Sequence, residues 1–217
     1  MAEQGVEMRA AQYPGRENRW GEPLIRSVSA MVDHWSEHWE ELAGSDDVPI
    51  FFYGHSMGVL VAYELAQRLQ GSGSVKVLKG LILGGRNAPH VLSKHPPIHH
   101  LSDDEFLVEV ANRYGNLPTA LLGDQEMKDL IIPILKADFK LVDDYRPILP
   151  GGVLACPLVI LSGRDDSFTS SLELAGWDRY TAVGCVWKEI ESGHFFHQQA
   201  REKTLRLVLS FLAQSRA

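Results

Sequence analysis

The chain has 217 residues, of which 45% are hydrophobic and 23% are charged, an ordinary globular balance with enough apolar material for a sizeable core. This length favours one domain, so we expect residues 1–217 to fold together. The 21 Lys and Arg residues are outnumbered by 28 Asp and Glu residues, which disfavours nucleic-acid binding because that requires a dense basic surface.

The cysteines and the apolar runs exclude further classes of protein. Cys156 and Cys185 are too few for a disulfide framework, and their spacing matches no zinc motif. No apolar run approaches the roughly 18–20 residues that cross a bilayer, and Met1–Gly5 lacks the character of a signal peptide. We therefore expect a cytoplasmic protein that does not contact membranes, and we favour a monomer.

Strands and helices are predicted to alternate along the first third of the chain. Residues 6–13 can form a strand that ends at a Pro-Gly turn, and apolar residues at helical spacing predict a helix over 23–43. Residues 48–53 form a continuous apolar run, which is typical of a parallel strand buried on both faces. A helix over 59–69 and a strand over 75–83 follow.

The stretch from about 87 to 150 changes character and interrupts the alternation. It is rich in proline and histidine at first, and then predicts two helices, over 103–114 with Ser102 as N-cap and over 124–145. The remaining predicted elements are a strand over 157–161, a helix over 171–180, a strand over 185–190 and a helix over 197–212. This order predicts an α/β fold: a mostly parallel sheet, helices on both faces, and a helical insertion at about 87–150.

The strongest local signal is Gly54-His55-Ser56-Met57-Gly58, a G-x-S-x-G motif between a predicted buried strand and a predicted helix. In that context the motif predicts a nucleophile elbow, whose sharp turn requires small residues on both sides of the serine. Ser56 would stand above the sheet, and the Met57 amide would point at a developing oxyanion near the helix N-terminus. The simpler interpretation is a Gly-rich turn between a strand and a helix.

A serine nucleophile needs a base that a carboxylate orients, and both positions are filled in the expected chain order. Asp165 and Asp166 follow the strand at 157–161, and His194 follows the strand at 185–190. We favour Asp166 because acids of this fold usually come three residues after a glycine, here Gly163, with Asp165 as the alternative. His197 is a rival base, but it lies in the predicted last helix and is interpreted as a surface or packing residue.

Other motifs have simpler explanations. Residues 34–38 match the H-x-x-E-H zinc-protease pattern, but they are better explained as an amphipathic helix that packs Trp35 and Trp39 on the sheet. The four histidines between 90 and 100 could bind a metal, although the adjacent prolines favour an irregular connector. The acidic pairs at 103–104 and 143–144 are interpreted as solvated helix faces. We therefore expect no metal site.

Four segments together resemble the type II (external) thioesterases of polyketide and non-ribosomal peptide synthesis and the animal medium-chain thioesterase of fatty-acid synthesis. They are residues 13–19 (YPGRENR), 52–58 (FYGHSMG), 135–139 (LKADF) and 193–196 (GHFF). The resemblance implies an α/β-hydrolase fold, a triad of Ser56, Asp166 and His194, and a helical lid at about 87–150 over an acyl channel. It also implies hydrolysis of acyl groups on the phosphopantetheine arm of acyl or peptidyl carrier proteins.

One feature departs from the family pattern. Its members begin with a further strand, a Gly-rich turn that supplies a second oxyanion amide, and a helix, whereas Met1–Gly5 resembles only the end of that helix. We therefore expect the sequence to be N-terminally truncated and to lack that donor, which is worth about 10²–10³ in kcat where it has been measured.

The functional prediction is a serine thioesterase that requires no metal or organic cofactor. A carboxylester hydrolase would use identical machinery, because the triad does not record whether oxygen or sulfur leaves. A non-catalytic acyl- or carrier-binding protein that kept the elbow is the alternative from another class. Arg16, Arg19, Arg86 and Arg113 could contact an acidic carrier protein.

Overall fold

The computed structural model describes residues 5–44, 48–73, 78–91, 93–115, 123–147 and 152–214. The chain divides into two compact units, one from Met1–Gly44 and Pro97–Asp143, the other from Ser45–Pro96 and Asp144–Ala217. We call the first the helical unit and the second the sheet unit. The single domain over 1–217 and the lid boundaries at about 87–150 stay predictions. Within the described ranges, no helix is both long and apolar enough to span a bilayer.

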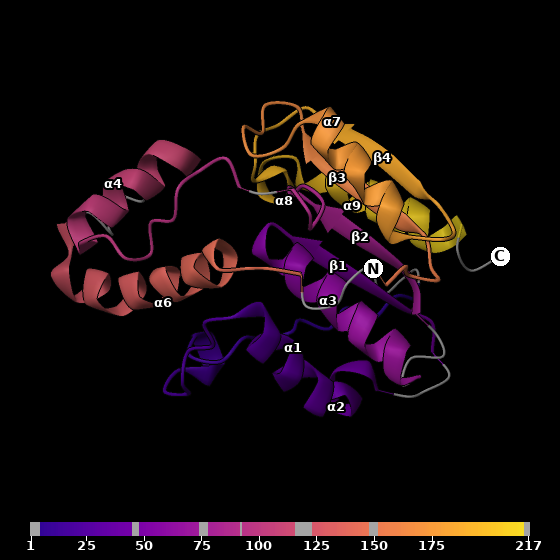
Figure 1. Ribbon diagram of the computed structural model, residues 1–217, viewed down its shortest axis with the longest axis horizontal. Coiled ribbons are helices and arrows are strands. Elements are labelled where there is room, and N and C mark those ends of the chain that lie inside the picture. Colours follow the sequence, from indigo (N-terminus) through magenta and orange to yellow (C-terminus); the bar gives the residue numbers. More distant parts are fainter. Residues whose placement is uncertain are drawn as a thin grey trace. The chain divides into compact units, whose positions relative to one another are not determined.

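The sheet unit is built on parallel strands that follow one another in chain order. The described strands are β1 (Ile50–His55), β2 (Leu78–Gly84), β3 (Leu158–Gly163) and β4 (Cys185–Ile190), adjacent in that order (Figure 1). Every neighbouring pair is parallel, with Leu83 opposite Gly54 on one side and opposite Ile160 on the other. The strand predictions over 48–53, 157–161 and 185–190 are confirmed to within two residues. The predicted strand over 75–83 is confirmed from residue 78, since 75–77 lie outside the described residues.

Helices cover both faces of this sheet, as the alternation predicts. Crossovers that step in one direction along a parallel sheet are right-handed and place their helices on one face. Accordingly α3 (Met57–Ser72) shares an apolar core with the 3₁₀ helix η3 (Ala175–Tyr180), which follows α7 (Ser171–Leu174). The buried members of this core include Val59, Tyr63, Ala66, Leu81, Leu83, Ile160 and Trp177.

The opposite face of the sheet packs against the C-terminal helices α8 (Phe196–Gln199) and α9 (Arg201–Gln214). Neighbouring side chains of a strand point to opposite faces. Phe52 packs against the core of α3, whereas the Phe51 ring lies 5.8 Å from that of Phe211 in α9. The end of β2 faces α8 in the same way, because a β-carbon at Gly84 would lie 2.9 Å from the Phe196 ring.

The helical unit contains α1 (Val28–Glu37), α2 (Trp39–Ala43), α4 (Asp103–Tyr114), α6 (Gln125–Asp143) and the short 3₁₀ helix η2 (Glu17–Arg19). Ser102 caps α4 as predicted, in a full capping box with Glu105. An apolar cluster of Ile98, Phe106, Leu107, Val110 and Ile132 joins α4 to α6.

An ion pair ties two of the segments that carry the family resemblance. Arg16 donates two hydrogen bonds to Asp138 of α6, at 2.7 and 2.8 Å, and both side chains are about four-fifths buried. The Arg16 guanidinium also lies 5.5 Å from the centre of the Tyr13 ring. Burial and the Asp138 charge raise the pKa of the Tyr13 hydroxyl, so that it stays neutral.

Three predicted elements are corrected. Residues 6–13 form no strand; the Gln12 carbonyl instead accepts a hydrogen bond from the Arg19 side chain at 2.9 Å. The helix predicted over 23–43 begins only at Val28, because the Ser27 side chain caps it at the Ala30 amide, and it divides into α1 and α2 at His38. The helix predicted over 197–212 is likewise divided, at Ala200, whose ψ of 42° is not helical.

Two smaller predictions are also corrected. The helix over 171–180 is one α-helical turn followed by the 3₁₀ helix η3. Asp143 is not on a solvated face: its side chain is only 6% exposed and accepts hydrogen bonds from the His99 ring and the Ile98 amide, at 3.0 and 3.1 Å.

Candidate functional site

Ser56 occupies the sharp turn between β1 and α3, and its backbone is strained. Its φ of 51° and ψ of −112° lie outside the regions that a residue with a side chain prefers. The Ser56 amide donates to the Gly84 carbonyl at 2.8 Å, which continues the β1–β2 ladder up to the turn. This is the strand, strained serine and helix of a nucleophile elbow.

The two glycines of the motif have different physical roles. A β-carbon at Gly54 would collide with the Gly58 carbonyl oxygen and lie 2.8 Å from the Val59 nitrogen, so the tight turn excludes a side chain there. At Gly58, by contrast, no described atom lies within 4 Å of an added β-carbon. The expectation that the turn requires a small residue on both sides therefore holds for Gly54 and not for Gly58.

The loop after β3 places Asp166, rather than Asp165, next to His194. The Asp166 Oδ2 atom accepts a hydrogen bond from His194 Nδ1 at 3.0 Å, and its Oδ1 accepts one from the Phe168 amide at 2.9 Å. The Asp166 side chain is fully buried, whereas Asp165 is exposed. Both Asp166 oxygens are thus engaged, which fixes the plane of the carboxylate.

Glycine at position 163 lets two loops pass each other closely. One is the loop after β3, which carries Asp166 and is called the acid loop; the other is the loop after β4, which carries His194. A β-carbon at Gly163 would lie 2.5 Å from the Ser192 carbonyl oxygen and closer still to that of Gly193. The Asp165 amide donates to the same Ser192 carbonyl at 3.1 Å. The contact between the two loops explains why a glycine precedes the acid by three residues.

His194 packs against neighbouring aromatic rings in addition to its hydrogen bond with Asp166. Its side chain is 7% exposed, and its ring centre lies 5.0 Å from that of Phe168 and 5.1 Å from that of His55. His55 is the residue immediately before Ser56. The structure therefore brings Asp166 and His194 into direct contact and places Ser56 at the same carboxyl edge of the sheet, which is where parallel α/β sheets bind their ligands.

Met57 is the first residue of α3. The N–H groups of a helix's first turn have no carbonyl partner within the helix, and the helix dipole makes this end favourable for negative charge. The structure thus places the predicted oxyanion donor directly after Ser56, at a helix N-terminus.

A histidine cluster at this site is not predicted from the sequence. The His55 ring lies 4.1 Å from the His197 ring of α8, in addition to its contact with His194. Burial, followed by the neighbouring His197 and His194, lowers the pKa of His55 to about 3. Burial and His194 also lower the pKa of His197. The G-H-S motif and the H-F-F-H spacing contain these residues, but only the fold shows that their rings meet.

Four of the six histidines considered as metal ligands have hydrogen-bond partners. His34 accepts a hydrogen bond from Arg19 at 3.0 Å, and the His38 ring bonds the His34 carbonyl at 2.8 Å. His99 pairs with Asp143, and His90 with the Tyr180 hydroxyl at 3.0 Å. In the part of the chain that the structure describes, no group of three or more His, Cys, Asp or Glu side chains is arranged to hold a metal ion.

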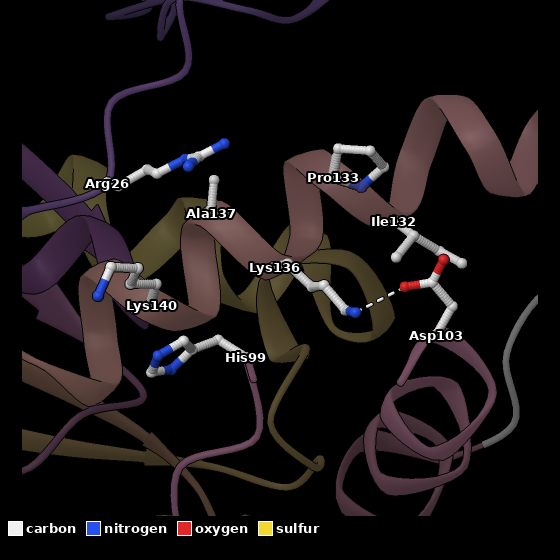
Figure 2. Close-up of a pocket in the computed structure, with 8 residues that line it drawn as sticks. All are labelled: Arg26, His99, Asp103, Ile132, Pro133, Lys136, Ala137 and Lys140. Atoms are coloured by element: carbon white, nitrogen blue, oxygen red, sulfur yellow. Dashed lines mark hydrogen bonds and ion pairs between the residues drawn. The ribbon is translucent and has the colours of Figure 1, made fainter. Parts of the chain in front are cut away.

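A separate pocket lies in the helical unit, beside α6, and is lined partly by Arg26, His99, Asp103, Lys136 and Lys140. Its cationic side chains do not converge: Figure 2 shows Lys136 directed at Asp103, while Arg26 and Lys140 extend in other directions. The Lys136–Asp103 ion pair measures 2.6 Å. The candidate nucleophile Ser56 and the candidate base His194 both belong to the sheet unit.

Comparison with known proteins identifies the family of this chain. A sequence profile of the thioesterase domain matches residues 2–212. The chain is 32% identical over 90% of its length to a probable cadicidin biosynthesis thioesterase of Streptomyces griseus, and 33% identical over 88% to the thioesterase PikA5 of Streptomyces venezuelae. It spans 52% and 66% of those proteins, respectively.

A solved structure extends the similarity to the fold. YbtT, a type II thioesterase from the yersiniabactin NRPS/PKS biosynthetic pathway, superposes with a TM-score of 0.83 at 26% identity, over 94% of this chain and 81% of that one. Together with the parallel sheet flanked by helices, this confirms the α/β-hydrolase fold. The chain belongs to the thioesterase family and resembles its type II members.

Proposed function

We propose that this protein is a serine thioesterase that hydrolyses acyl thioesters on the phosphopantetheine arm of acyl or peptidyl carrier proteins. Ser56 is the nucleophile, His194 the general base and Asp166 the residue that orients the base. The observation that carries the proposal is a strained serine at a nucleophile elbow, at the same edge of the sheet as a buried histidine that donates to a buried carboxylate. Membership of the thioesterase family supports the choice of substrate.

The hydrogen bond to Asp166 determines which nitrogen of His194 can act. With the proton on Nδ1 directed at Asp166, the lone pair of the neutral ring is on Nε2. Nε2 takes the proton of the Ser56 hydroxyl while the Ser56 oxygen attacks the thioester carbonyl carbon. Nε2 then gives that proton to the departing thiolate, which leaves as the free thiol. In the second half, Nε2 takes a proton from water, the hydroxide cleaves the acyl ester, and Ser56 recovers its proton.

The Met57 amide stabilises the negative charge that develops on the carbonyl oxygen. Its place at the start of α3 adds the field of the helix to one hydrogen-bond donor. No step of this scheme needs a metal ion or an organic cofactor.

The proposed partner is the carrier protein itself, but two of the suggested contact residues do not support it. Arg16 is bound to Asp138, and Arg19 makes a charge pair with Glu22 at 2.5 Å and contacts Gln12 and His34. Both guanidinium groups therefore have partners within the helical unit. Their role is to hold that unit together.

A carboxylester hydrolase and a non-catalytic binding protein are the competing functions. We would compare hydrolysis of one acyl group as a carrier-protein thioester, as an N-acetylcysteamine thioester and as an oxygen ester, using the wild type and Ser56→Ala. A thioesterase cleaves the carrier thioester with the highest kcat/KM and loses the activity in Ser56→Ala. Preference for the oxygen ester would favour the first competitor. Binding of the acyl carrier by both proteins, with turnover by neither, would favour the second.

A further inference from the structure

The ring of His55, the residue before Ser56, packs against the ring of His194. The His55 ring contacts His194, Phe196 and His197 at centre-to-centre distances of 5.1, 5.0 and 4.1 Å. Phe168 lies against His194 as well, with its ring centre at 5.0 Å. His194 is therefore in contact with rings from two different parts of the sheet unit, His55 at the end of β1 and Phe168 in the loop after β3.

The chain directly after β2 leaves room for the His55 ring, because Gly85 has no side chain. A β-carbon at Gly85 would lie 2.9 Å from Cε1 of His55 and 3.3 Å from Cε1 of His194. The two imidazoles thus share the space over one glycine. Removal of either ring would leave the other without part of its packing.

Burying the two ring nitrogens of His55 lowers the stability of the fold. Both ring nitrogens are buried, and neither makes a hydrogen bond of regular geometry to a described residue, although the His194 backbone lies close enough to raise the pKa of the ring. A buried polar group without a full hydrogen bond is destabilising, so an apolar residue would be the more stable choice for packing alone. Costs of this kind are found at functional sites.

Burial keeps the His55 ring neutral, and the neighbouring imidazoles add to this effect. Burial disfavours the charged form most strongly, and the positive charges that His197 of α8 and His194 of the loop before α8 would carry disfavour it further. Asp166 and the His194 backbone act in the opposite direction but do not outweigh burial. Among the three imidazoles, His194 is the one bonded to a carboxylate.

We propose that His55 is a positioning residue, whose ring holds the His194 imidazole against Phe168 in line with Asp166. This inference rests on the proposed function. It assigns His55 no contact with the reacting atoms. The shape of the ring and its lack of charge are the two properties that matter.

The test combines kinetics with a direct measurement of protonation. We would measure kcat/KM against pH for the wild type, His55→Phe and His55→Ala with an acyl N-acetylcysteamine thioester. His55→Phe keeps the ring and the lack of charge, so we expect kcat/KM within about threefold of the wild type and the same pH profile. His55→Ala admits water beside His194, so we expect at least a tenfold loss and an acid limb displaced toward higher pH, because water stabilises the protonated base. His90→Ala, a histidine outside the cluster, should change kcat/KM less than twofold.

Imidazole ¹⁵N spectra of the wild type provide a readout that does not depend on activity. The His55 ring should stay neutral from pH 8 down to pH 4.5. Titration of His55 in that range would overturn the inference, as would an unchanged pH profile and rate in His55→Ala, or a loss in His55→Phe as large as in His55→Ala. If His55→Ala does not fold, the spectra and His55→Phe still decide. If the wild type itself has no hydrolytic activity, the proposed function fails, while the spectra still report on His55.

Discussion

Asp166→Asn should abolish most of the activity by reversing the tautomer of His194. The Asp166 Oδ1 atom accepts from the Phe168 amide, and Oδ2 accepts from His194 Nδ1. In the variant, the single carbonyl oxygen of Asn would keep the Phe168 bond, so the NH₂ group would face His194. Nδ1 must then accept a hydrogen bond, and the proton of the neutral ring moves to Nε2, which can no longer take the Ser56 proton.

The size of the loss follows from the change of tautomer. The same substitution in another serine hydrolase triad costs about 10⁴ in kcat, or about 5 kcal/mol of transition-state stabilisation at roughly 1.4 kcal/mol per factor of ten. Because the Asp166 side chain is fully buried, water cannot replace the lost acceptor. We therefore expect a loss of about 10³-fold or more in both kcat and kcat/KM.

The assay is release of the carrier thiol from an acyl carrier protein, measured from pH 6 to 9. Asp165→Asn is the matched control, because Asp165 is exposed and its backbone amide, not its side chain, makes the contact with Ser192. It should stay within about threefold of the wild type. Asp166→Asn with more than a tenth of the wild-type activity, or Asp165→Asn as the more damaged variant, would refute the assignment of the acid.

Three further results are expected. Asp138→Ala leaves the Arg16 guanidinium without its bidentate partner, and should lower the free energy of unfolding by about 2–4 kcal/mol in urea denaturation, somewhat less than for a fully buried pair because each side chain is about one-fifth exposed. Gly163→Ala forces the loop at 192–193 away and displaces His194, so kcat should fall at least tenfold, measured as thioester hydrolysis by folded protein. The pKa of His55 is about 3 in the folded state and near 6.5 unfolded, so the unfolded chain binds the extra proton; stability should fall as the pH drops from about 6.5 toward 3, and His55→Phe should make that slope shallower.

The first two of these results have matched controls. Arg164→Ala removes exposed ion pairs with Glu189 and Glu191 and should cost less than about 1 kcal/mol. Gly71→Ala adds a methyl group where no described atom lies within 4 Å, so kcat should not change. An Asp138→Ala loss of stability no larger than that of Arg164→Ala would contradict the argument for the Arg16 pair. A fully active Gly163→Ala would contradict the argument for the loop contact. An equal fall of stability with pH in the wild type and His55→Phe would contradict the argument for His55.

The sequence was informative where one local signal decides the structure. The capping box at Ser102 sets the start of α4, and the apolar run before Ser56 becomes β1 close to its predicted bounds. Chain order alone brings Ser56, Asp166 and His194 to one edge of the sheet, because they follow β1, β3 and β4 and all parallel strands end at the same edge.

Features that depend on distant contacts could not be predicted. Residues 6–13 have a strand pattern, but a strand needs a neighbouring backbone to pair with, and a side chain from Arg19 bonds this segment instead. Neither periodicity nor spacing predicts that Asp143 is buried against His99, or that His55 and His197 meet beside His194. These contacts join segments that are far apart in the sequence, so only the packed fold shows them.

The most direct test of the central claim is intact-mass spectrometry of the protein mixed with an acyl carrier protein in a single turnover. The account predicts a transient mass increase equal to the acyl group, located on Ser56, together with release of the free carrier thiol, and neither in Ser56→Ala. Hydrolysis that persists in Ser56→Ala, or a folded wild type that never acquires the acyl group and never releases the thiol, would contradict it.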